Sequence, residues 1–274
     1  MIIEGKKIAE EILEQLREKR KNYDKLKIAA FLIGEEEEKV SFLKIKQKFA
    51  EELNIEFRIY RLEESLTKKK IRKYISQILK HKTIQGAIFQ LPIPSKFPVQ
   101  YLLNSIPPKK DIDCLSSRML GKYYSDNYLI RPPVVEVVDC LRERYNLNFE
   151  GKTVLIVGYG RLVGKPLAHY FANLKSTVII SQSQTKIENF LNIADVIIGG
   201  AGRANLINDC KQGAVLIDFG YSFQNGKIWG DINFESTKDK AYLITPTPGG
   251  TGPILVAKLF ENFFKLLEAE KLVI

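Results

Sequence analysis

Cysteine, histidine, methionine and tryptophan are scarce in this chain of 274 residues, which has three cysteines and two histidines. Cys114, Cys140 and Cys210 are far apart and odd in number, so they do not form a disulfide framework. His81 and His169 show no zinc-like spacing to the cysteines. The sequence therefore predicts no metal site and fits a reducing compartment.

Long apolar runs are also missing, and none approaches the roughly 20 residues that a membrane-spanning helix needs. The first seven residues carry charges of both signs and lack the apolar core of a signal peptide. With 45% hydrophobic residues, the chain can form one large domain or two ordinary ones. We therefore expect a cytoplasmic protein that does not contact a membrane.

Acidic residues are outnumbered by basic ones, and the formal net charge is +10. A positive field attracts polyanions, and residues 68–73 form the densest basic run. We interpret this run as the solvated face of a helix whose apolar face carries Ile71, Ile75, Ile78 and Leu79. No aromatic residue interleaves with the lysines to stack bases. A dinucleotide phosphate or a glutamate-tailed substrate also suits the field, and nucleic acid is the alternative partner.

Apolar runs and helical patterns alternate in both halves of the chain, with an irregular stretch at 114–132 where we place the domain boundary. The expected strands cover 28–33, 56–61, 86–90, 153–157, 177–180, 195–198 and 214–218. The expected helices cover 6–20, 40–53, 67–81, 134–145, 164–173, 186–192 and 253–269. This order predicts parallel sheets with crossover helices, the hallmark of an α/β fold.

Three glycines, Gly158, Gly160 and Gly164, connect the strand 153–157 to the helix that follows it. Gly158 permits a tight turn, and Gly160 lets the backbone approach a phosphate. The amides and dipole at the helix start also favour an anion. The spacing is one residue longer than the common dinucleotide fingerprint, so a turn that only packs strand against helix is the alternative.

The residues after the second strand of this half, Ser181–Thr185, include no acidic side chain. An acidic residue there would bind both ribose hydroxyls of NAD. Hydroxyls and amides accept either a bare ribose or its 2′-phosphate, and Arg161 is the nearest cation for that phosphate. The sequence favours NADP and leaves NAD open.

One lysine falls on a helix face that is otherwise apolar. Phe42, Lys46, Phe49 and Leu53 share this face at positions i, i+4, i+7 and i+11. A lysine in such a place usually extends to water. If it lies near an apolar cavity instead, desolvation lowers its pKa and suits it to proton chemistry.

Three further features follow apolar strands. Gln90 ends the third strand, where open α/β sheets place their ligand crevice. Asp111 and Asp113 lie in a loop rich in proline and lysine, and either one could cap a turn. The segment 244–253 has three prolines and three glycines, which predicts a shaped loop rather than a regular element.

These segments, in this order, resemble the methylenetetrahydrofolate dehydrogenase/cyclohydrolase family over almost the whole chain. The most specific segment is Thr245–Pro253, which resembles the family's substrate loop. The other matching segments are Ile3–Lys7, Gln90–Pro94, Lys110–Asp113, Val163–Pro166 and Gly230–Phe234.

The resemblance implies a homodimer of chains with two three-layer α/β domains and a folate-binding cleft between them. Residues 1–125, joined by the C-terminal helix 253–274, would form the catalytic domain, and residues 126–252 would form a Rossmann-like NAD(P)-binding domain. The implied activity is oxidation of 5,10-methylenetetrahydrofolate to 5,10-methenyltetrahydrofolate with NADP or NAD, followed by hydrolysis to 10-formyltetrahydrofolate. A dehydrogenase without the hydrolase step, or a non-catalytic folate- or nucleotide-binding relative, is the alternative.

The resemblance also assigns residue roles. Lys46 would be the central catalytic group, Gln90 would hydrogen-bond it, and Asp113 would accept two hydrogen bonds from the amino-pyrimidine edge of the pterin. The implied folate contacts are Phe42, Leu91, Pro248, Gly249, Gly250, Thr251, Gly252 and Pro253. The implied cofactor contacts are Gly158, Tyr159, Gly160, Arg161, Gly164, Ser183, Thr185 and Tyr221.

Several positions depart from the family pattern. Phe42 replaces a tyrosine, so the ring is kept and the hydroxyl is lost. The other departures are Glu36–Lys39 for Pro-Ala-Ser, Cys114 for glycine, Ile130–Pro133 for Pro-Cys-Thr-Pro, Tyr159-Gly160 for Arg-Ser, and Gln182 for histidine. We expect these changes to affect the cyclohydrolase step and the cofactor preference more than the fold.

Overall fold

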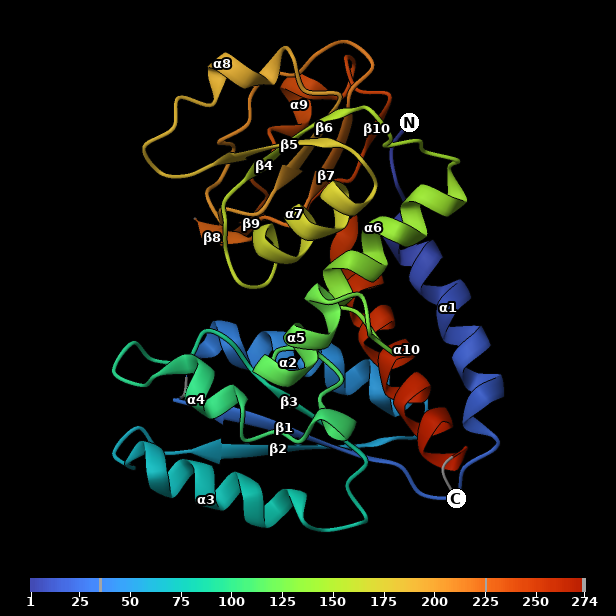
Figure 1. Ribbon diagram of the computed structural model, residues 1–274, viewed down its shortest axis with the longest axis vertical. Coiled ribbons are helices and arrows are strands. Elements are labelled where there is room, and N and C mark those ends of the chain that lie inside the picture. The colour runs from blue at the N-terminus through green and yellow to red at the C-terminus, as the bar shows by residue number, and fades with distance from the viewer. Residues whose placement is uncertain (35, 225, 273–274) are drawn as a thin grey trace. The chain divides into compact units, whose positions relative to one another are not determined.

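The computed structural model describes residues 1–34, 36–224 and 226–272 and forms two compact units. Unit 1 contains Met1–Glu10 and Val134–Leu255, and unit 2 contains Glu11–Pro133 and the chain from Val256 onwards. Each unit has its own parallel sheet with helices on its faces (Figure 1). The predicted α/β class with two domains is therefore confirmed. Among the described residues, no helix is both long and apolar enough to cross a membrane.

Unit 2 is built around a three-stranded parallel sheet. Its elements are β1 (Lys27–Ile33), α2 (Glu37–Glu52), β2 (Glu56–Leu62), α3 (Lys68–Leu79), β3 (Gly86–Phe89), α4 (Val99–Leu103), the 3₁₀ turn η1 (Pro108–Lys110) and α5 (Ser117–Tyr124). Two further helices, α1 (Gly5–Arg20) and α10 (Thr251–Lys271), have residues in both units.

The strand order β2-β1-β3 creates a switch point in unit 2. The chain moves from β1 to one neighbour and then crosses to the other, so the crevice at the carboxyl ends of β1 and β3 is the expected place for a ligand. All of β1 after Lys27 is buried, because α2 and α3 cover opposite faces of the sheet (Figure 1).

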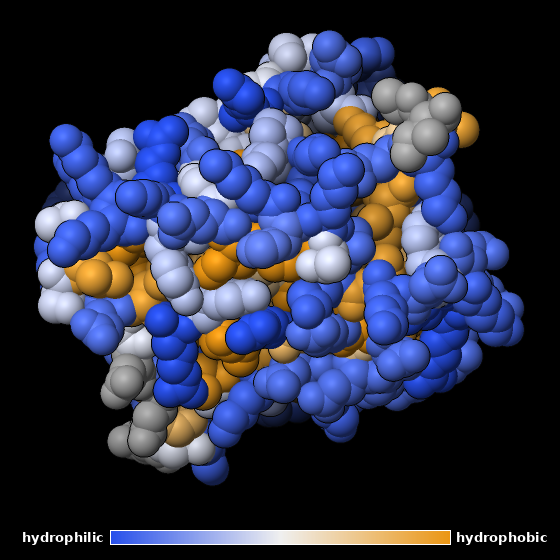
Figure 2. Space-filling view, turned by 90° about the horizontal axis from the view of Figure 1, so that it is seen from below, coloured by the Kyte–Doolittle hydropathy of each residue, from blue (hydrophilic) through white to orange (hydrophobic). Residues whose placement is uncertain are grey.

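Helix α3 confirms the interpretation of the basic run as a solvated face. Ile71, Ile75 and Leu79 are buried in the core, while the lysines and Arg72 are exposed. The face of the molecule seen from below is mostly hydrophilic, with hydrophobic patches between the hydrophilic side chains (Figure 2). The structure adds two aromatic contacts that the linear sequence does not reveal, both with Tyr101. The Lys68 Nζ lies 5.7 Å from the centroid of this ring. Arg72 lies over the ring of Tyr101 from α4, with its guanidinium carbon 4.8 Å from the ring centroid.

Unit 1 is built around a five-stranded parallel sheet with the order β10-β7-β6-β4-β5. Its elements are α6 (Pro133–Arg144), β4 (Thr153–Val157), α7 (Gly164–Asn173), β5 (Thr177–Ser181), α8 (Glu188–Leu191), β6 (Val196–Gly199), β7 (Val215–Asp218), β8 (Ser222–Gln224), β9 (Lys227–Trp229), α9 (Phe234–Thr237) and β10 (Leu243–Ile244). The crossing from β5 to β6 passes β4, so the switch point of this sheet lies between β4 and β6.

Some expectations are corrected. The stretch 114–132 contains α5, which begins at a serine cap: the Ser116 hydroxyl accepts from the Met119 amide. The hairpin of β8 and β9 and the short elements α4, α9 and β10 were also missed, because few residues carry each pattern. The segment 244–253 is not wholly irregular, since Ile244 ends β10 and α10 begins at Thr251.

The first ten residues cluster with unit 1 in the structure. Ile2 bridges to Ile244 in parallel, and the Ile3 amide donates to the Ile244 carbonyl at 2.9 Å. Ile3 is 1% exposed, so its burial beside β10 holds this segment there. The remaining predicted bounds, 1–125 with 253–274 and 126–252, stay a prediction, and residues 273 and 274 lie outside the described part of the chain.

Asn262 of α10 is a fully buried amide that ties together two loops of unit 2. Its Nδ2 donates to the Ile112 carbonyl at 3.2 Å and to the Arg131 carbonyl at 2.9 Å. Two carbonyl partners fix the amide orientation, because only the NH₂ end can donate. Its Oδ1 has no partner among the described residues. Asn262 therefore holds the chain directly beside Asp113.

We expect Asn262→Ala to destabilise the protein by about 1–3 kcal/mol, because two buried carbonyls lose their donor. Denaturant unfolding followed by circular dichroism measures this change. Ser105→Ala is the matched control: Ser105 Oγ is also buried but has no hydrogen-bond partner in the described residues. Its removal should change the free energy of unfolding by less than about 1 kcal/mol. Equal losses in the two variants would contradict the role given to Asn262.

Candidate active site

Lys46 and Gln90 meet at the switch point of unit 2. Helix α2 follows β1 and carries Lys46, while Gln90 directly follows β3. The Lys46 Nζ donates to Gln90 Oε1 at 2.8 Å. The ammonium group therefore has a hydrogen-bond partner inside the unit, the residue as a whole is half-buried, and its part in proton chemistry stays a prediction. Burial lowers the pKa of Lys46, and the negative charge of Asp113 opposes this shift.

Gln90 is held so that its carbonyl oxygen faces Lys46. The side chain is 6% exposed, and its Nε2 donates to the Leu91 carbonyl at 2.7 Å. The backbone is fixed as well, because the Gln90 amide donates to the Phe31 carbonyl of β1 at 2.8 Å. Since the NH₂ end is already engaged, the oxygen is the end available to accept from an ammonium group.

Asp113 lies close enough to Lys46 for each charge to shift the pKa of the other group. Burial raises the pKa of Asp113 to about 6, Lys46 lowers it, and Asp111 raises it further. Asp113 is thus ionised at neutral pH and protonated in mildly acidic solution. This arrangement places one acid and one base of perturbed pKa in the same crevice, which is a pattern typical of active sites.

Asp111 is the aspartate that caps a turn, and Asp113 is not. The Asp111 carboxylate accepts from the Leu115 amide at 3.3 Å and from the Ser116 amide at 2.7 Å, at the start of α5. Lys110 is structural too, because its Nζ donates to the Leu79 carbonyl at the end of α3. In the segment Lys110–Asp113, Lys110 and Asp111 therefore hold the backbone, while the Asp113 carboxylate interacts with the charge of Lys46.

The glycine loop of unit 1 opens at the switch point between β4 and β6. Gly158 has a φ of 97°, and a Cβ there would lie 2.7 Å from the Gly200 carbonyl oxygen. A Cβ on Gly164 would lie 2.0 Å from the Gly158 oxygen, so this glycine serves the packing of loop on helix. In contrast, a Cβ on Gly160 would meet nothing within 4 Å. The open space beside Gly160 leaves room for a ligand, so the packing role of Gly158 and Gly164 is shown and phosphate binding by the loop stays a prediction.

Other predicted cofactor contacts lie around the same carboxyl edge. Ser183 and Thr185 belong to the turn after β5, in which Thr185 Oγ1 accepts from the Gln182 amide at 3.0 Å. Tyr159 is exposed, with its ring centroid 5.7 Å from the Lys165 Nζ. Arg161 and Tyr221 are half-buried on the loops that follow β4 and β7.

The proline-glycine loop belongs to unit 1 and is tightly anchored. The Gly250 amide donates to the Pro246 carbonyl at 2.7 Å, and the Thr251 hydroxyl donates to the Asp218 carbonyl at 2.5 Å. A Cβ on Gly5 would lie 1.7 Å from the Gly250 oxygen, so the start of α1 packs directly on this loop. Among the predicted folate contacts, Pro248–Pro253 thus share one short segment, while Phe42 and Leu91 are half-buried in unit 2.

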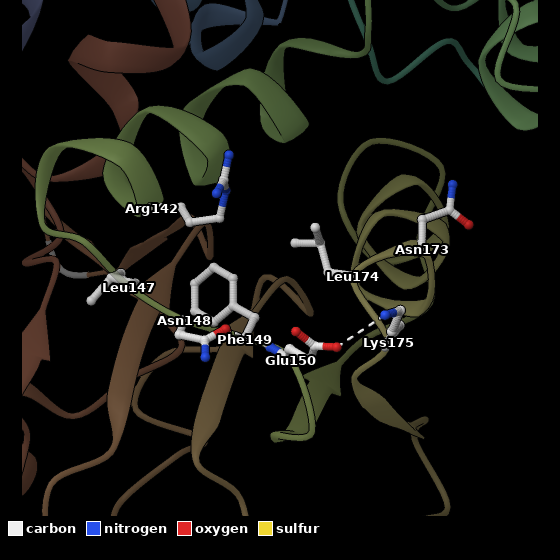
Figure 3. A pocket seen from close by; sticks show the side chains of 8 residues that line it. All are labelled: Arg142, Leu147, Asn148, Phe149, Glu150, Asn173, Leu174 and Lys175. Carbon is white, nitrogen blue, oxygen red and sulfur yellow. Dashed lines mark hydrogen bonds and ion pairs between the residues drawn. The ribbon is translucent and has the colours of Figure 1, made fainter.

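A cavity of about 220 Å³ lies elsewhere in unit 1 (Figure 3). Its lining residues come from the end of α6, the segment before β4 and the end of α7, and include Arg142, Phe149 and Lys175. Lys175 is engaged in an ion pair with Glu150 at 3.0 Å. None of the predicted site residues lines this cavity, so it is not the candidate active site.

The sequence analysis missed three buried polar residues beside the predicted contacts: Asn262, Asp218 and Asp231. Burial raises the pKa of Asp218 to about 6. The sequence offers a reason to examine two of them, because Asp218 ends an apolar strand and Asp231 lies in Gly230–Phe234, a segment that resembles the family. Apart from the Gly220 amide, which lies two residues from Asp218, the partners of these side chains are more than ten residues away in sequence, so only the structure reveals most of their contacts.

Two family models match the chain. Residues 3–113 match the catalytic domain of tetrahydrofolate dehydrogenase/cyclohydrolase, and residues 132–271 match its NAD(P)-binding domain. The resemblance inferred from the sequence is therefore confirmed.

Similar proteins cover the whole chain. The bifunctional protein FolD of Clostridium perfringens (strain 13 / Type A) is 35% identical over 274 residues, which cover 97% of this chain and 99% of the relative. The crystal structure of the bifunctional FolD enzyme from Campylobacter jejuni is 30% identical, with a TM-score of 0.91, and the match covers 98% of this chain and 99% of that one. The corresponding enzyme from Thermoplasma acidophilum is 28% identical, with a TM-score of 0.88 and 99% of both chains covered. On these grounds, this chain belongs to the tetrahydrofolate dehydrogenase/cyclohydrolase family.

Proposed function

We propose that this chain oxidises 5,10-methylenetetrahydrofolate to 5,10-methenyltetrahydrofolate with NADP and then hydrolyses the product to 10-formyltetrahydrofolate. Family membership over both units and the bifunctional relatives support this function. The observation that carries the proposal is the engaged Lys46 ammonium, 2.8 Å from Gln90 Oε1 and electrostatically coupled to Asp113.

Lys46 is the proposed central catalytic residue. Its lowered pKa increases the fraction of neutral amine near neutral pH, and a neutral amine can accept a proton from an attacking water. Gln90 orients the nitrogen, because its oxygen accepts one Lys46 hydrogen while its own NH₂ is fixed on the Leu91 carbonyl. The ammonium form, restored by that transfer, can donate a proton to the substrate.

Asp113 is the proposed anchor for the pterin. An ionised carboxylate has two acceptor oxygens that match two donors on the amino-pyrimidine edge. A ligand that lacked these donors would leave a partly buried carboxylate unpaired, which costs about 1–3 kcal/mol. We further propose that the Phe42 ring stacks on the pterin, and that Leu91 and the segment Pro248–Pro253 contact the folate. Because Phe42 has no hydroxyl, the hydrolysis step lacks any help that a tyrosine there would give.

The cofactor site of this proposal comprises the glycine loop (Gly158, Tyr159, Gly160, Arg161 and Gly164) with Ser183, Thr185 and Tyr221. When bound, the nicotinamide accepts the hydride from the methylene carbon of the folate. The open space at Gly160 and the start of α7 suit the phosphates. The turn Ser181–Thr185 offers hydroxyls and amides instead of an acidic side chain, which supports NADP and tolerates NAD.

We also propose that the protein is a cytoplasmic homodimer. Among the described residues, Cys114, Cys140 and Cys210 form no disulfide, which suits a reducing compartment. The dimer rests on the family resemblance alone, and light scattering on the purified protein tests it.

Purified protein mixed with 5,10-methylenetetrahydrofolate and NADP should reduce the nicotinamide, measured by its absorbance. The same assay with NAD gives the cofactor preference, which we expect to favour NADP. Binding of folate without reduction of either cofactor at saturating concentrations would support the non-catalytic alternative and contradict the proposed activity.

Lys46→Met should slow hydrolysis of 5,10-methenyltetrahydrofolate by at least about 100-fold, because the proton-transferring group is removed. The decay of methenyl absorbance measures this rate. Lys44→Met is the matched control, since Lys44 is exposed on the same helix. Full hydrolysis in the Lys46 variant would remove this residue from the mechanism.

Substrate affinity should fall in acid because Asp113 must be ionised to accept two hydrogen bonds. With a pKa of about 6, the carboxyl group is increasingly protonated below that pH. We expect the KM for folate to rise about tenfold per pH unit below 6 and to be flat above it. In Asp113→Asn, the KM should be high and independent of pH over the same range. A flat wild-type profile between pH 7 and 5 would count against the anchor role.

A further inference from the structure

Two carboxylates of unit 1, Asp218 and Asp231, are buried next to each other without a catalytic role. Their residues are 1% and 0% exposed, respectively. Burying two carboxylates is costly unless their oxygens are satisfied. In the part of the chain that the structure describes, each hydrogen-bond donor to their side chains is a backbone amide. The pair is therefore a device for holding backbone segments in place.

Asp231 holds the loop that follows β6. Its Oδ2 accepts from the Ala201 amide at 2.5 Å and from the Gly202 amide at 3.3 Å. Its Oδ1 accepts from the Arg203 amide at 2.6 Å. This loop starts at the switch point, where Gly200 packs against Gly158 of the glycine loop. Asp231 thus fixes the wall that faces the proposed phosphate site.

Asp218 holds both ends of the proline-glycine loop through its own backbone. Its amide donates to Thr245 Oγ1 at 2.7 Å, and its carbonyl accepts from Thr251 Oγ1 at 2.5 Å. Its side chain accepts from the Gly220 amide at 2.7 Å, just before Tyr221. One residue at the end of β7 therefore positions the proposed folate loop and one proposed cofactor contact.

The two carboxylates are linked directly. Asp218 Oδ1 accepts from the Asp231 amide at 3.2 Å, and Asp218 Oδ2 accepts from the Ile232 amide at 3.0 Å. The packing around them leaves little room to relax. A Cβ on Gly230 would lie 1.9 Å from Asp218 Oδ2, and a Cβ on Gly220 would lie 2.3 Å from Asp231 Oδ1. A displacement of one carboxylate must therefore displace the other.

We propose that Asp218 and Asp231 are positioning residues that couple the dinucleotide site to the proline-glycine loop, so that order in one segment stabilises the other. Asp231 belongs to Gly230–Phe234, one of the segments that resemble the family, and this proposal gives that segment a structural role. The inference rests on the proposed function for the identity of the two ligands, NADP and the folate. Such coupling is reciprocal, so cofactor binding should tighten folate binding and the reverse.

Asp231→Asn tests the coupling with almost no change in shape. An amide cannot accept hydrogen bonds at both ends, so at least one bond to the loop 201–203 is lost. We expect the Kd for NADP, measured by titration calorimetry, to rise about tenfold, the scale of one lost charged hydrogen bond. The KM for folate should rise about threefold or more, although Asp231 makes no hydrogen bond to the proline-glycine loop in the described structure.

Asp195→Asn is the matched control in the same unit. Asp195 precedes β6 at the opposite edge of the sheet, where it accepts from the Thr153 amide at 3.0 Å and pairs with Lys211. This variant should leave both the Kd and the KM unchanged. If Asp231→Asn lowers only the melting temperature and keeps both constants at the wild-type values, the residue is merely structural and the proposal is overturned.

Amide hydrogen exchange of the wild-type protein, measured with and without NADP, tests the same coupling even if the Asp231→Asn variant does not fold. Addition of NADP should slow exchange of the amides at 201–203 and also of the Gly250 and Ile232 amides. Protection restricted to the glycine loop and residues 201–203 would overturn the coupling. Failure of the proposed function gives a different result, because the wild-type protein would then bind NADP but produce no methenyl product. If only the coupling fails, the wild-type protein still turns over its substrate.

Discussion

The partly buried ammonium group of Lys46 is the constraint on which the candidate site depends. Removing the Lys46 charge from water is unfavourable, and it is tolerated because Gln90 Oε1 accepts a hydrogen bond and Asp113 supplies a negative charge. The same burial that lowers the pKa of Lys46 raises that of Asp113. Each group therefore sits closer to neutrality than it would in water, and each makes the charged state of the other less costly. Removing one of them would leave the other as an unpaired buried charge.

Each unit has a parallel sheet with a switch point in its strand order, and the proposed site residues lie at the carboxyl edge of the sheet. In unit 2 the order β2-β1-β3 opens a switch point beside Gln90, and in unit 1 the order β10-β7-β6-β4-β5 opens one beside Gly158. Strands that point in the same direction bring their carboxyl ends to one edge, so loops distant in sequence become neighbours. Side chains that are adjacent at such an edge need no regular spacing in the chain. This explains why the site combines residues as far apart in sequence as Lys46 of α2 and Gln90 after β3.

The sequence allows the prediction of most elements, because long apolar runs and amphipathic periods are local signals. The strand 153–157 and the helix 164–173 match β4 and α7. Helix α5 was missed because its start depends on the buried Asp111 carboxylate and the Ser116 cap rather than on a long apolar period. The sequence could not show which of Asp111 and Asp113 caps the turn and which lies near Lys46, because both belong to the same short loop. The contacts of Asn262 span more than a hundred residues of sequence, so no pattern within the sequence could reveal them.

One departure from the family pattern falls where the backbone keeps its shape. Cys114 stands where the family has glycine, and it retains a left-handed φ of 56°, which costs a non-glycine residue free energy. The turn nevertheless persists, because the Asp111 carboxylate and Asn262 hold the chain on both sides of it. Asp113 therefore keeps its place beside Lys46 despite the substitution. The substitution at Phe42 differs from that at Cys114, because it removes one hydroxyl group and makes no demand on the backbone conformation. The change at Phe42 can therefore alter the side-chain chemistry of the proposed site, while the hydrogen bonds of Asp111 and Asn262 hold the backbone beside Asp113.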